Sequence, residues 1–242
     1  MWSQVEIIMT KEYKSTGGVY QEGYQRCVTP PRKMSKNESF EKNGYLLVPG
    51  LIADPENLYV PLPQERGQIT YYNNRMDKYE HLPMESQVNG SLARYNIPTY
   101  RELHFLVKKE VEKRLEMDLH PTYFYDRFYF PNQQLLRHSD RPACEVSVSL
   151  QISTTLKNPW PIWFERPDGS ESYVEMNNGD AVIYKGCERE HWRDPMPDEV
   201  PFWKKKIAKI KGKEIEQHHH QIFLHYVNAN GPYVQCSFDA TR

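Results

Sequence analysis

Hydrophobic and polar residues alternate over several short stretches of this chain, most clearly between residues 143 and 154. Within that stretch apolar side chains occupy every second position, at Val146, Val148, Leu150 and Ile152. A period of two is typical of a β-strand that buries one face. Strand-like runs also occur within residues 44–52, 122–130, 160–165, 172–176, 181–184 and 221–227, with turn-forming residues between them. Many short strands separated by turns predict a mainly β domain, built as a sandwich or a barrel.

The main departure from this pattern is a helical period over residues 99–119. Its apolar positions recur at steps of three and four residues, at Leu103, Leu106, Val107, Val111 and Leu115. This spacing predicts an amphipathic helix that supports the sheet. A shorter helix is expected after Asp54 as N-cap, with Pro55 in the first helical position. Residues 64–98 have no clear period and are expected to cover the surface, and residues 194–216, rich in Pro and Lys, are expected to form a loop.

The length of 242 residues is enough for one large domain. We expect an irregular N-terminal arm over residues 1–38, followed by a single domain over residues 39–242 that combines β-strands with flanking helices. The net charge of −1 produces no overall field toward nucleic acid or a membrane surface, so neither is an expected partner. The sequence does not define an oligomeric state.

The four cysteines are scattered along the chain, at Cys27, Cys144, Cys187 and Cys236. Because no Cys-x-x-Cys spacing occurs, we expect free thiols in a reducing compartment. The first residues do not combine a basic region with an apolar core, so no secretory signal is expected. No run approaches the roughly 18 apolar residues of a spanning helix. These observations predict a soluble, cytoplasmic protein.

The most informative stretch for chemistry is His138-Ser-Asp140, which precedes the alternating strand. Side chains two apart on a strand point to the same face, so His138 and Asp140 can aim at one point. His191, which follows the strand-like residues 181–184, is the candidate third ligand. Two His and one carboxylate form a facial triad with three open positions, as in non-haem Fe(II) oxygenases.

These residues and several others together resemble one known family, the Fe(II)- and 2-oxoglutarate-dependent dioxygenases, in the branch similar to prolyl 4-hydroxylase catalytic domains. The resemblance spans roughly residues 39–239. Its motifs are Phe40-x-x-x-Gly44, residues 121–127, His138-Ser-Asp140-Arg-Pro-Ala-Cys144, Gly179-Asp180, Tyr184-Lys-Gly-Cys-Glu-x-x-His191-Trp-Arg193 and Phe223-Leu-His225-Tyr-Val227. The resemblance implies a double-stranded β-helix, or jelly-roll, with His138, Asp140 and His191 as iron ligands. It also implies Fe(II), 2-oxoglutarate and O2 as cofactors, with ascorbate as a further reductant.

The residues that would hold 2-oxoglutarate are less clear from the sequence. The resemblance gives Tyr129, nine residues before His138, a hydroxyl contact with 2-oxoglutarate. Relatives place a Lys or Arg on the last strand to bind the far carboxylate, but the equivalent face here carries no basic side chain except imidazoles. Arg193 is the first substitute, because it is two residues past His191 and can present a bidentate guanidinium. His225 is the second, and the weaker candidates are Lys185, Arg137 and Arg141.

The sequence therefore predicts a hydroxylase of a C–H bond, acting on a small molecule or peptide, such as a peptidyl or free amino-acid side chain. Two alternatives remain open: a jelly-roll metalloenzyme that uses no 2-oxoglutarate, and a non-catalytic binding module that keeps the fold. The cluster of residues 218–220, all His, is not expected to bind one ion, because neighbouring residues on a strand face opposite ways. The lysine-rich residues 204–213 are interpreted as a solvated loop, with a lid or a contact for an acidic substrate as alternatives.

Overall fold

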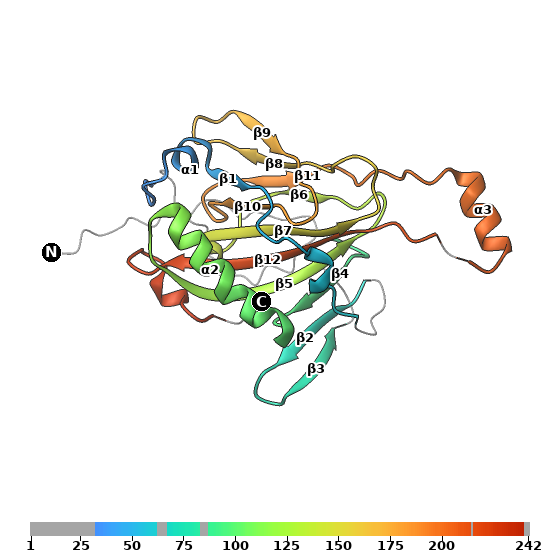
Figure 1. The fold of residues 1–242 in the computed structure, drawn as a ribbon, viewed down its shortest axis with the longest axis horizontal. Helices are drawn as coiled ribbons and strands as arrows, with labels where there is room; N and C mark the ends of the chain where they lie inside the picture. The colour runs from blue at the N-terminus through green and yellow to red at the C-terminus, as the bar shows by residue number, and fades with distance from the viewer. Residues whose placement is uncertain (1–31, 62–66, 83–86, 214, 240–242) are drawn as a thin grey trace, which may run out of the picture.

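The computed structural model describes residues 32–61, 67–82, 87–213 and 215–239 (Figure 1). Two β-sheets dominate it. The larger has eight strands in the order β1-β10-β7-β12-β5-β4-β2-β3, and the smaller has four in the order β6-β11-β8-β9. The strands are β1 Tyr45–Val48, β2 Ile69–Asn73, β3 Lys78–Leu82, β4 Leu92–Tyr95, β5 Leu119–Tyr129, β6 Leu135–His138, β7 Val146–Thr154, β8 Ile162–Glu165, β9 Glu171–Val174, β10 Ala181–Tyr184, β11 His191–Arg193 and β12 His219–Asn228. The α-helices are α1 Glu38–Asn43, α2 Arg101–Leu115 and α3 Phe202–Ile210.

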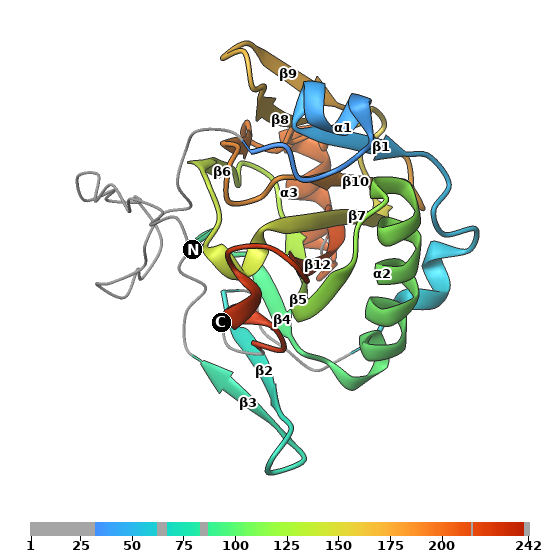
Figure 2. The same cartoon turned by 90° about the vertical axis from the view of Figure 1, so that its left-hand side faces the viewer.

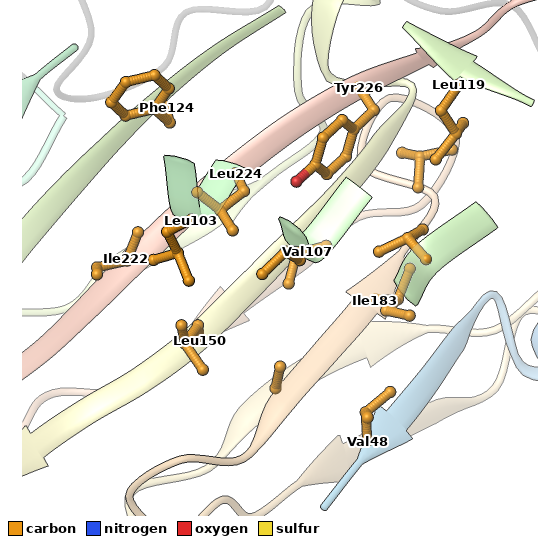
Figure 3. Packing of buried hydrophobic residues seen from close by; sticks show 14 of the residues in the cluster. Val48, Leu103, Val107, Leu119, Phe124, Leu150, Ile183, Ile222, Leu224 and Tyr226 are labelled. Atoms are coloured by element: carbon orange, nitrogen blue, oxygen red, sulfur yellow. The ribbon is translucent and has the colours of Figure 1, made fainter. Parts of the chain in front are cut away.

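Helix α2 packs against one face of the larger sheet (Figure 2). The alternation predicted for β7 is present, because Val148 and Leu150 are fully buried on this face. Val148 and Leu150 belong to one apolar layer with Leu224 of β12 and with Leu103 and Val107 of α2. Figure 3 shows Leu150 beside the residues of β12 and α2. Burial of apolar surface stabilises a fold by about 25 cal/mol for each Å² removed from water. We therefore expect this layer to be the main source of stability.

The opposite face of the larger sheet turns toward the smaller sheet and has a different character. Aromatic contacts join the two sheets, with the Phe164 ring 5.3 Å from that of Tyr184 and the Tyr129 ring 5.2 Å from that of Trp160. Between these contacts the interior is polar. Its buried polar side chains come from three neighbouring strands, with Ser147, Ser149 and Gln151 on β7, Arg127 on β5, and His219, Gln221 and His225 on β12.

Several expectations from the sequence need correction. Residues 64–98 were expected to be surface covering, yet their described part holds β2, β3 and β4, and β4 lies inside the larger sheet. Residues 194–216 were expected to be a loop, yet they contain α3. Leu106 was assigned to the buried face of its helix but is 54% exposed. Asp54 precedes a short 3-10 helix, Pro55–Leu58, without capping it through its side chain.

The cysteines also depart from expectation. Cys144 and Cys236 are free, as predicted. Cys187 is disulfide-bonded, so the prediction of free thiols is wrong for this position. Because disulfides persist mainly in oxidising environments, this bond disagrees with the expected reducing compartment. Most of the predicted arm, residues 1–31, also lies outside the described part of the chain, and no described helix is both long and apolar enough to span a bilayer.

Candidate metal centre

The three residues of the predicted triad converge on one point. The Nε2 atom of His138 lies 3.5 Å from Asp140 Oδ1, and the Nε2 atom of His191 lies 3.6 Å from the same oxygen. The two imidazole rings are 4.4 Å apart between centroids. All three ligand atoms fall within 4.8 Å of one another, a separation suited to a single metal ion. Both histidines are buried and Asp140 is partly buried.

Strand pairing brings these residues together. His138 ends β6 and stands directly opposite His191, the first residue of β11. Asp140 lies beyond the end of β6, so the expectation that the His-x-Asp pair shares a strand is wrong for the carboxylate. Its position is set instead by its backbone N–H, which donates to the carbonyl oxygen of Gly186 at 2.9 Å.

Gly186 permits this close approach. A Cβ atom at that position would lie 2.6 Å from Asp140 Oδ2 and 2.4 Å from Ser147 Oγ, which is shorter than side-chain contacts allow. Only glycine can therefore occupy this position without moving the carboxylate ligand. The loop between β10 and β11 thus packs tightly against the turn that carries Asp140.

Backbone carbonyl groups orient both imidazoles. The Nδ1 atom of His138 lies 2.7 Å from the carbonyl oxygen of Leu136, and that of His191 lies 3.2 Å from the carbonyl oxygen of Arg189. Each ring must therefore carry its proton on Nδ1, which leaves the Nε2 lone pair facing Asp140. Sequence reasoning missed Gln87, whose side-chain nitrogen lies 3.1 Å from His138 Nε2 and donates to that lone pair.

The protonation states also suit a metal. Burial lowers the pKa of His191 to about 4, so this imidazole stays neutral. Burial opposes ionisation of Asp140, but its attraction to the protonated forms of His191 and His138 outweighs this effect and holds the pKa of the carboxyl below its usual range. Neutral imidazoles and an ionised carboxylate are the forms that bind a divalent cation.

A second group, formed by Asp140, Cys144 and His225, lies beside the triad. Burial raises the pKa of the Cys144 thiol well above its usual value, which disfavours the thiolate that would bind a metal. The Nδ1 atom of His225 lies 2.9 Å from Ser147 Oγ, and that hydroxyl lies 3.2 Å from Asp140 Oδ2. This second group therefore supports Asp140 rather than forming a separate metal site.

Arg193 lies on the same strand as His191 and is 1% exposed. The burial pattern of β11 alternates, so His191 and Arg193 both face the interior while Trp192 faces away. The Arg193 guanidinium donates through Nη1 to the carbonyl oxygen of Trp160. Its Nε and Nη2 atoms have no hydrogen-bond partner within the described residues. Burial lowers the pKa of Arg193 to about 10, so at neutral pH it is a buried cation, and no carboxylate in the described part of the chain pairs with it.

Other polar groups share the interior with Arg193. Within the part of the chain that the structure describes, the buried atoms without a hydrogen-bond partner include Ser149 Oγ, Gln151 Oε1, His225 Nε2, both side-chain amide atoms of Gln221 and both ring nitrogens of His219. Buried polar atoms are nearly always satisfied in folded proteins, so a cluster of exceptions indicates a place for a polar ligand.

Tyr129 and Arg127 form part of the same space. Tyr129 is fully buried, and the Nη1 atom of Arg127 donates to its hydroxyl at 3.5 Å. Arg127 was not among the predicted residues. The signal for it was present, because a period of two along β5 places it on the face of Tyr129.

The remaining basic candidates are engaged elsewhere. The Lys185 ammonium donates to Glu41 Oε2 and to the Arg32 carbonyl oxygen, both at 2.7 Å. Arg137 pairs with three glutamates, and Arg141 pairs with Asp239. Among the five basic residues considered from the sequence, only Arg193 and His225 face the polar interior.

The histidine cluster behaves as predicted. His219 points into the interior, while the Nε2 atom of His220 lies 2.9 Å from Asp126 Oδ2 on the other face of the sheet. Neighbouring histidines of this cluster therefore face opposite ways, as a strand requires.

Comparison with known proteins identifies the fold. No family model and no curated protein matches the chain. Among solved structures, it is similar to the non-heme alpha ketoglutarate dependent carbocyclase SnoK from nogalamycin biosynthesis, at 11% identity, with a TM-score of 0.51 over 88% of this chain and 96% of that one. It is also similar to HygX from Streptomyces hygroscopicus with nickel and 2-oxoglutarate bound, at 11% identity, with a TM-score of 0.50 over 87% of this chain and 91% of that one.

A 2OG-Fe(II) oxygenase family oxidoreductase from Burkholderia pseudomallei matches at 10% identity, with a TM-score of 0.50 over 76% of this chain and 86% of that one. The fold is that of the 2-oxoglutarate- and Fe(II)-dependent oxygenases. The predicted double-stranded β-helix is thereby confirmed. At such low identity the likeness concerns the fold alone.

Proposed function

We propose that this protein is an Fe(II)- and 2-oxoglutarate-dependent oxygenase. One observation carries the proposal: a metal-ligand candidate of the His-Asp-His group lies two residues along one strand from a buried cation that has no paired carboxylate among the described residues. His191 is the first and Arg193 is the second. Residues two apart on a strand are separated by about 6.6 Å, which is comparable with the length of an extended five-carbon dicarboxylate.

The donor set fits ferrous iron. Two imidazole nitrogens and one carboxylate oxygen on one side of an ion leave three positions open, as in non-haem Fe(II) oxygenases. When bound, iron and 2-oxoglutarate would supply the oxidation of a substrate C–H bond by O2, with succinate and CO2 as coproducts.

The chain's own residues would bind and orient the cosubstrate. Arg193 presents two unpaired donors to the far carboxylate, and a bidentate guanidinium–carboxylate pair gives both energy and direction. The Tyr129 hydroxyl lies in the same interior and would add a further hydrogen bond. The rings of Trp160 and Tyr129 pack against each other and are both buried, and an apolar surrounding of this kind strengthens a charged contact.

Ser147 and the backbone would hold the metal ligands. The Ser147 hydroxyl bonds Asp140 Oδ2, so the other oxygen, Oδ1, remains directed between the two imidazoles. Groups of this kind set the orientation and basicity of metal ligands. His225 supports the same hydroxyl from the opposite side.

The proposed substrate is a peptidyl or free amino-acid side chain, hydroxylated at carbon. Support for this narrower class comes from the sequence motifs that resemble prolyl 4-hydroxylase domains. The similar structures include a carbocyclase and an oxidoreductase, so the shared fold does not itself determine the substrate.

The experiment is an anaerobic titration of Fe(II)-loaded protein with 2-oxoglutarate, observed through the weak visible charge-transfer band of a chelated complex. We expect the band in the wild type and in Asp168→Ala, which removes an exposed turn carboxylate. We expect Asp140→Ala to lose the band and to bind Fe(II) more than about 100-fold more weakly.

Bound iron without the band would refute the 2-oxoglutarate assignment in favour of another metalloenzyme. Absence of iron binding in the wild type would refute both and favour a binding module.

A further inference from the structure

Helix α3 is an exposed amphipathic helix. It stands apart from both sheets, at one end of the long axis of the molecule (Figure 1). Its apolar side chains are unusually open to solvent, with Phe202 80%, Trp203 58%, Ile207 45% and Ile210 77% exposed. Trp203, Ile207 and Ile210 follow an i, i+4, i+7 spacing, so they form one ridge along the helix.

The rest of α3 and the residues just after it are strongly basic. Residues 202–213 contain no acidic residue and six lysines. These are Lys204, Lys205, Lys206, Lys209, Lys211 and Lys213. The net charge of −1 for the whole chain conceals this local concentration.

One row of lysines faces the body of the protein. Lys205, Lys209 and Lys213 line a hollow of about 680 Å³ together with Phe130 and Pro131, which follow β5. Lys205 also pairs with Asp198. Because Lys205 and Lys209 are on a different side of the helix from the apolar ridge, the ridge is directed away from the body. Lys204 and Lys206 lie along its two flanks.

The location separates α3 from the metal centre. β12 begins at His219, close after α3 in the chain, and His225, which supports Asp140, lies toward its other end. In Figure 1, α3 lies beyond one end of the larger sheet, and the C-terminal end of β12 lies at the other end. A partner bound at α3 would therefore lie away from the candidate metal centre.

We propose that α3 binds an anionic lipid bilayer and holds the protein at its surface. A helix with an aromatic and aliphatic ridge bordered by lysines is suited to lie in the interface, with the ridge among the acyl chains and the ammonium groups at the headgroups. Each lysine near an anionic surface adds attraction, and six of them suit acidic headgroups.

A bilayer fits these features better than an acidic protein does. Helix α3 projects from the end of the molecule (Figure 1), and its ridge is on the side opposite Lys205 and Lys209, so a flat surface can reach the ridge without colliding with the sheets. Lysines on both flanks match a surface that is charged on every side of the inserted ridge. This inference goes beyond the proposed enzymatic function, and it differs from the expectation, drawn from net charge, that no membrane is a partner.

The test is flotation of the full chain with vesicles of phosphatidylcholine containing about 30% phosphatidylserine, beside vesicles of pure phosphatidylcholine. We expect binding to the anionic vesicles at about 0.1 M salt, and at least a fivefold loss at about 0.5 M salt, because salt screens the lysines. We expect the double variant Trp203→Ser/Ile207→Ser to bind at least about tenfold more weakly.

The matched control is Phe105→Ser/Leu106→Ser, which removes an aromatic and an aliphatic side chain, 47% and 54% exposed, from α2. It should bind vesicles as the wild type does. A second variant, Lys204→Glu/Lys206→Glu/Lys211→Glu, keeps the ridge and should also lose binding. Far-ultraviolet circular dichroism and thermal melting would establish that all variants are folded.

The proposal would be overturned by a wild type that does not float with anionic vesicles, or by α3 variants that float like the control. Binding to a polyglutamate peptide without binding to vesicles would overturn it in favour of an acidic protein partner.

Discussion

The guanidinium of Arg193 stacks over the indole ring of Trp160, with its central carbon 4.7 Å from the ring centroid, and donates to the backbone carbonyl oxygen of the same residue. These two contacts fix the plane of the guanidinium. Its Nε and Nη2 atoms are buried and have no hydrogen-bond partner among the described residues. Arg193 is therefore oriented before any ligand arrives, which reduces the entropy lost on binding.

Replacing Arg193 with Gln should weaken 2-oxoglutarate binding and spare iron binding. Loss of one partner of a buried, hydrogen-bonded charge pair costs about 2–5 kcal/mol, which is roughly 30-fold or more in Kd. Isothermal titration of the metal-loaded protein measures both affinities. Arg137→Gln, which removes a guanidinium that pairs with glutamates outside the site, is the control and should bind 2-oxoglutarate normally. Unchanged affinity in Arg193→Gln would assign the far carboxylate to another cation, with His225 the next to test.

Replacing Ser147 with Ala should weaken Fe(II) binding by roughly 10-fold, since groups that hold a metal ligand typically contribute 10- to 100-fold. The change removes the hydroxyl that bonds both Asp140 and His225. Ser149→Ala is a close control, because Ser149 lies two residues along β7 on the same face and its hydroxyl has no partner among the described residues. Equal iron affinities in the two variants, measured by competition with a chromogenic chelator, would contradict the supporting role of Ser147.

Replacing Leu150 with Ala should lower the free energy of unfolding by about 2–5 kcal/mol, through lost burial and the cavity left behind. Leu150 is fully buried between the larger sheet and α2 (Figure 3). Leu106→Ala makes the same chemical change at an exposed position of α2 and should cost less than about 0.5 kcal/mol. Urea denaturation followed by circular dichroism measures both. A small loss at Leu150 would contradict the assignment of this layer as the main core.

The stability of the fold should fall in mild acid, partly through His104. Burial lowers the pKa of His104 to about 4, against the opposing hydrogen bond to the carbonyl oxygen of His225. An unfolded imidazole has a pKa near 6.5, so as pH falls from about 6.5 to about 4 the unfolded state takes up a proton that the folded state does not. The free energy of unfolding therefore decreases with falling pH in this window, by about 1.4 kcal/mol per pH unit for this group.

Urea denaturation between about pH 5 and pH 7 tests the role of His104. His104→Phe should make the free energy of unfolding depend less steeply on pH, because about one proton fewer is taken up on unfolding. Other buried histidines would maintain the remaining pH dependence. Phenylalanine suits the position because the imidazole already packs between Phe124 and Tyr226. A slope identical to that of the wild type would show that another group titrates.

Sequence periodicity predicted the strands and helices best where an element buries one face and exposes the other. The alternation of β7 and the helical period of α2 are of this kind, and both elements are present. β4 was missed because Ala93, Arg94 and Tyr95 are all buried, which removes the period of two. A polar residue inside such a strand is accommodated by pairing, here of Arg94 with Asp126 on β5, and pairing across strands cannot be read from local sequence.

The same limit applies to the candidate metal centre. Residue types and spacing were enough to select His138, Asp140 and His191. They were not enough to predict how Asp140 reaches the others, because that depends on the strand register of β6 with β11 and on a backbone bond to Gly186. Gln87 was also missed, since it approaches from a loop with no periodic pattern.

Buried donors that have no partner within the described ranges, such as those of Arg193 and Gln221, make the fold less stable than it would be with them satisfied. Under the proposed function, 2-oxoglutarate satisfies them only in the folded state, so it raises the free energy of unfolding as its concentration rises. Cellular proteases degrade the unfolded population. The abundance of this protein would then follow the supply of its cosubstrate, and scarcity of 2-oxoglutarate would shorten the lifetime of the enzyme as well as slow its turnover.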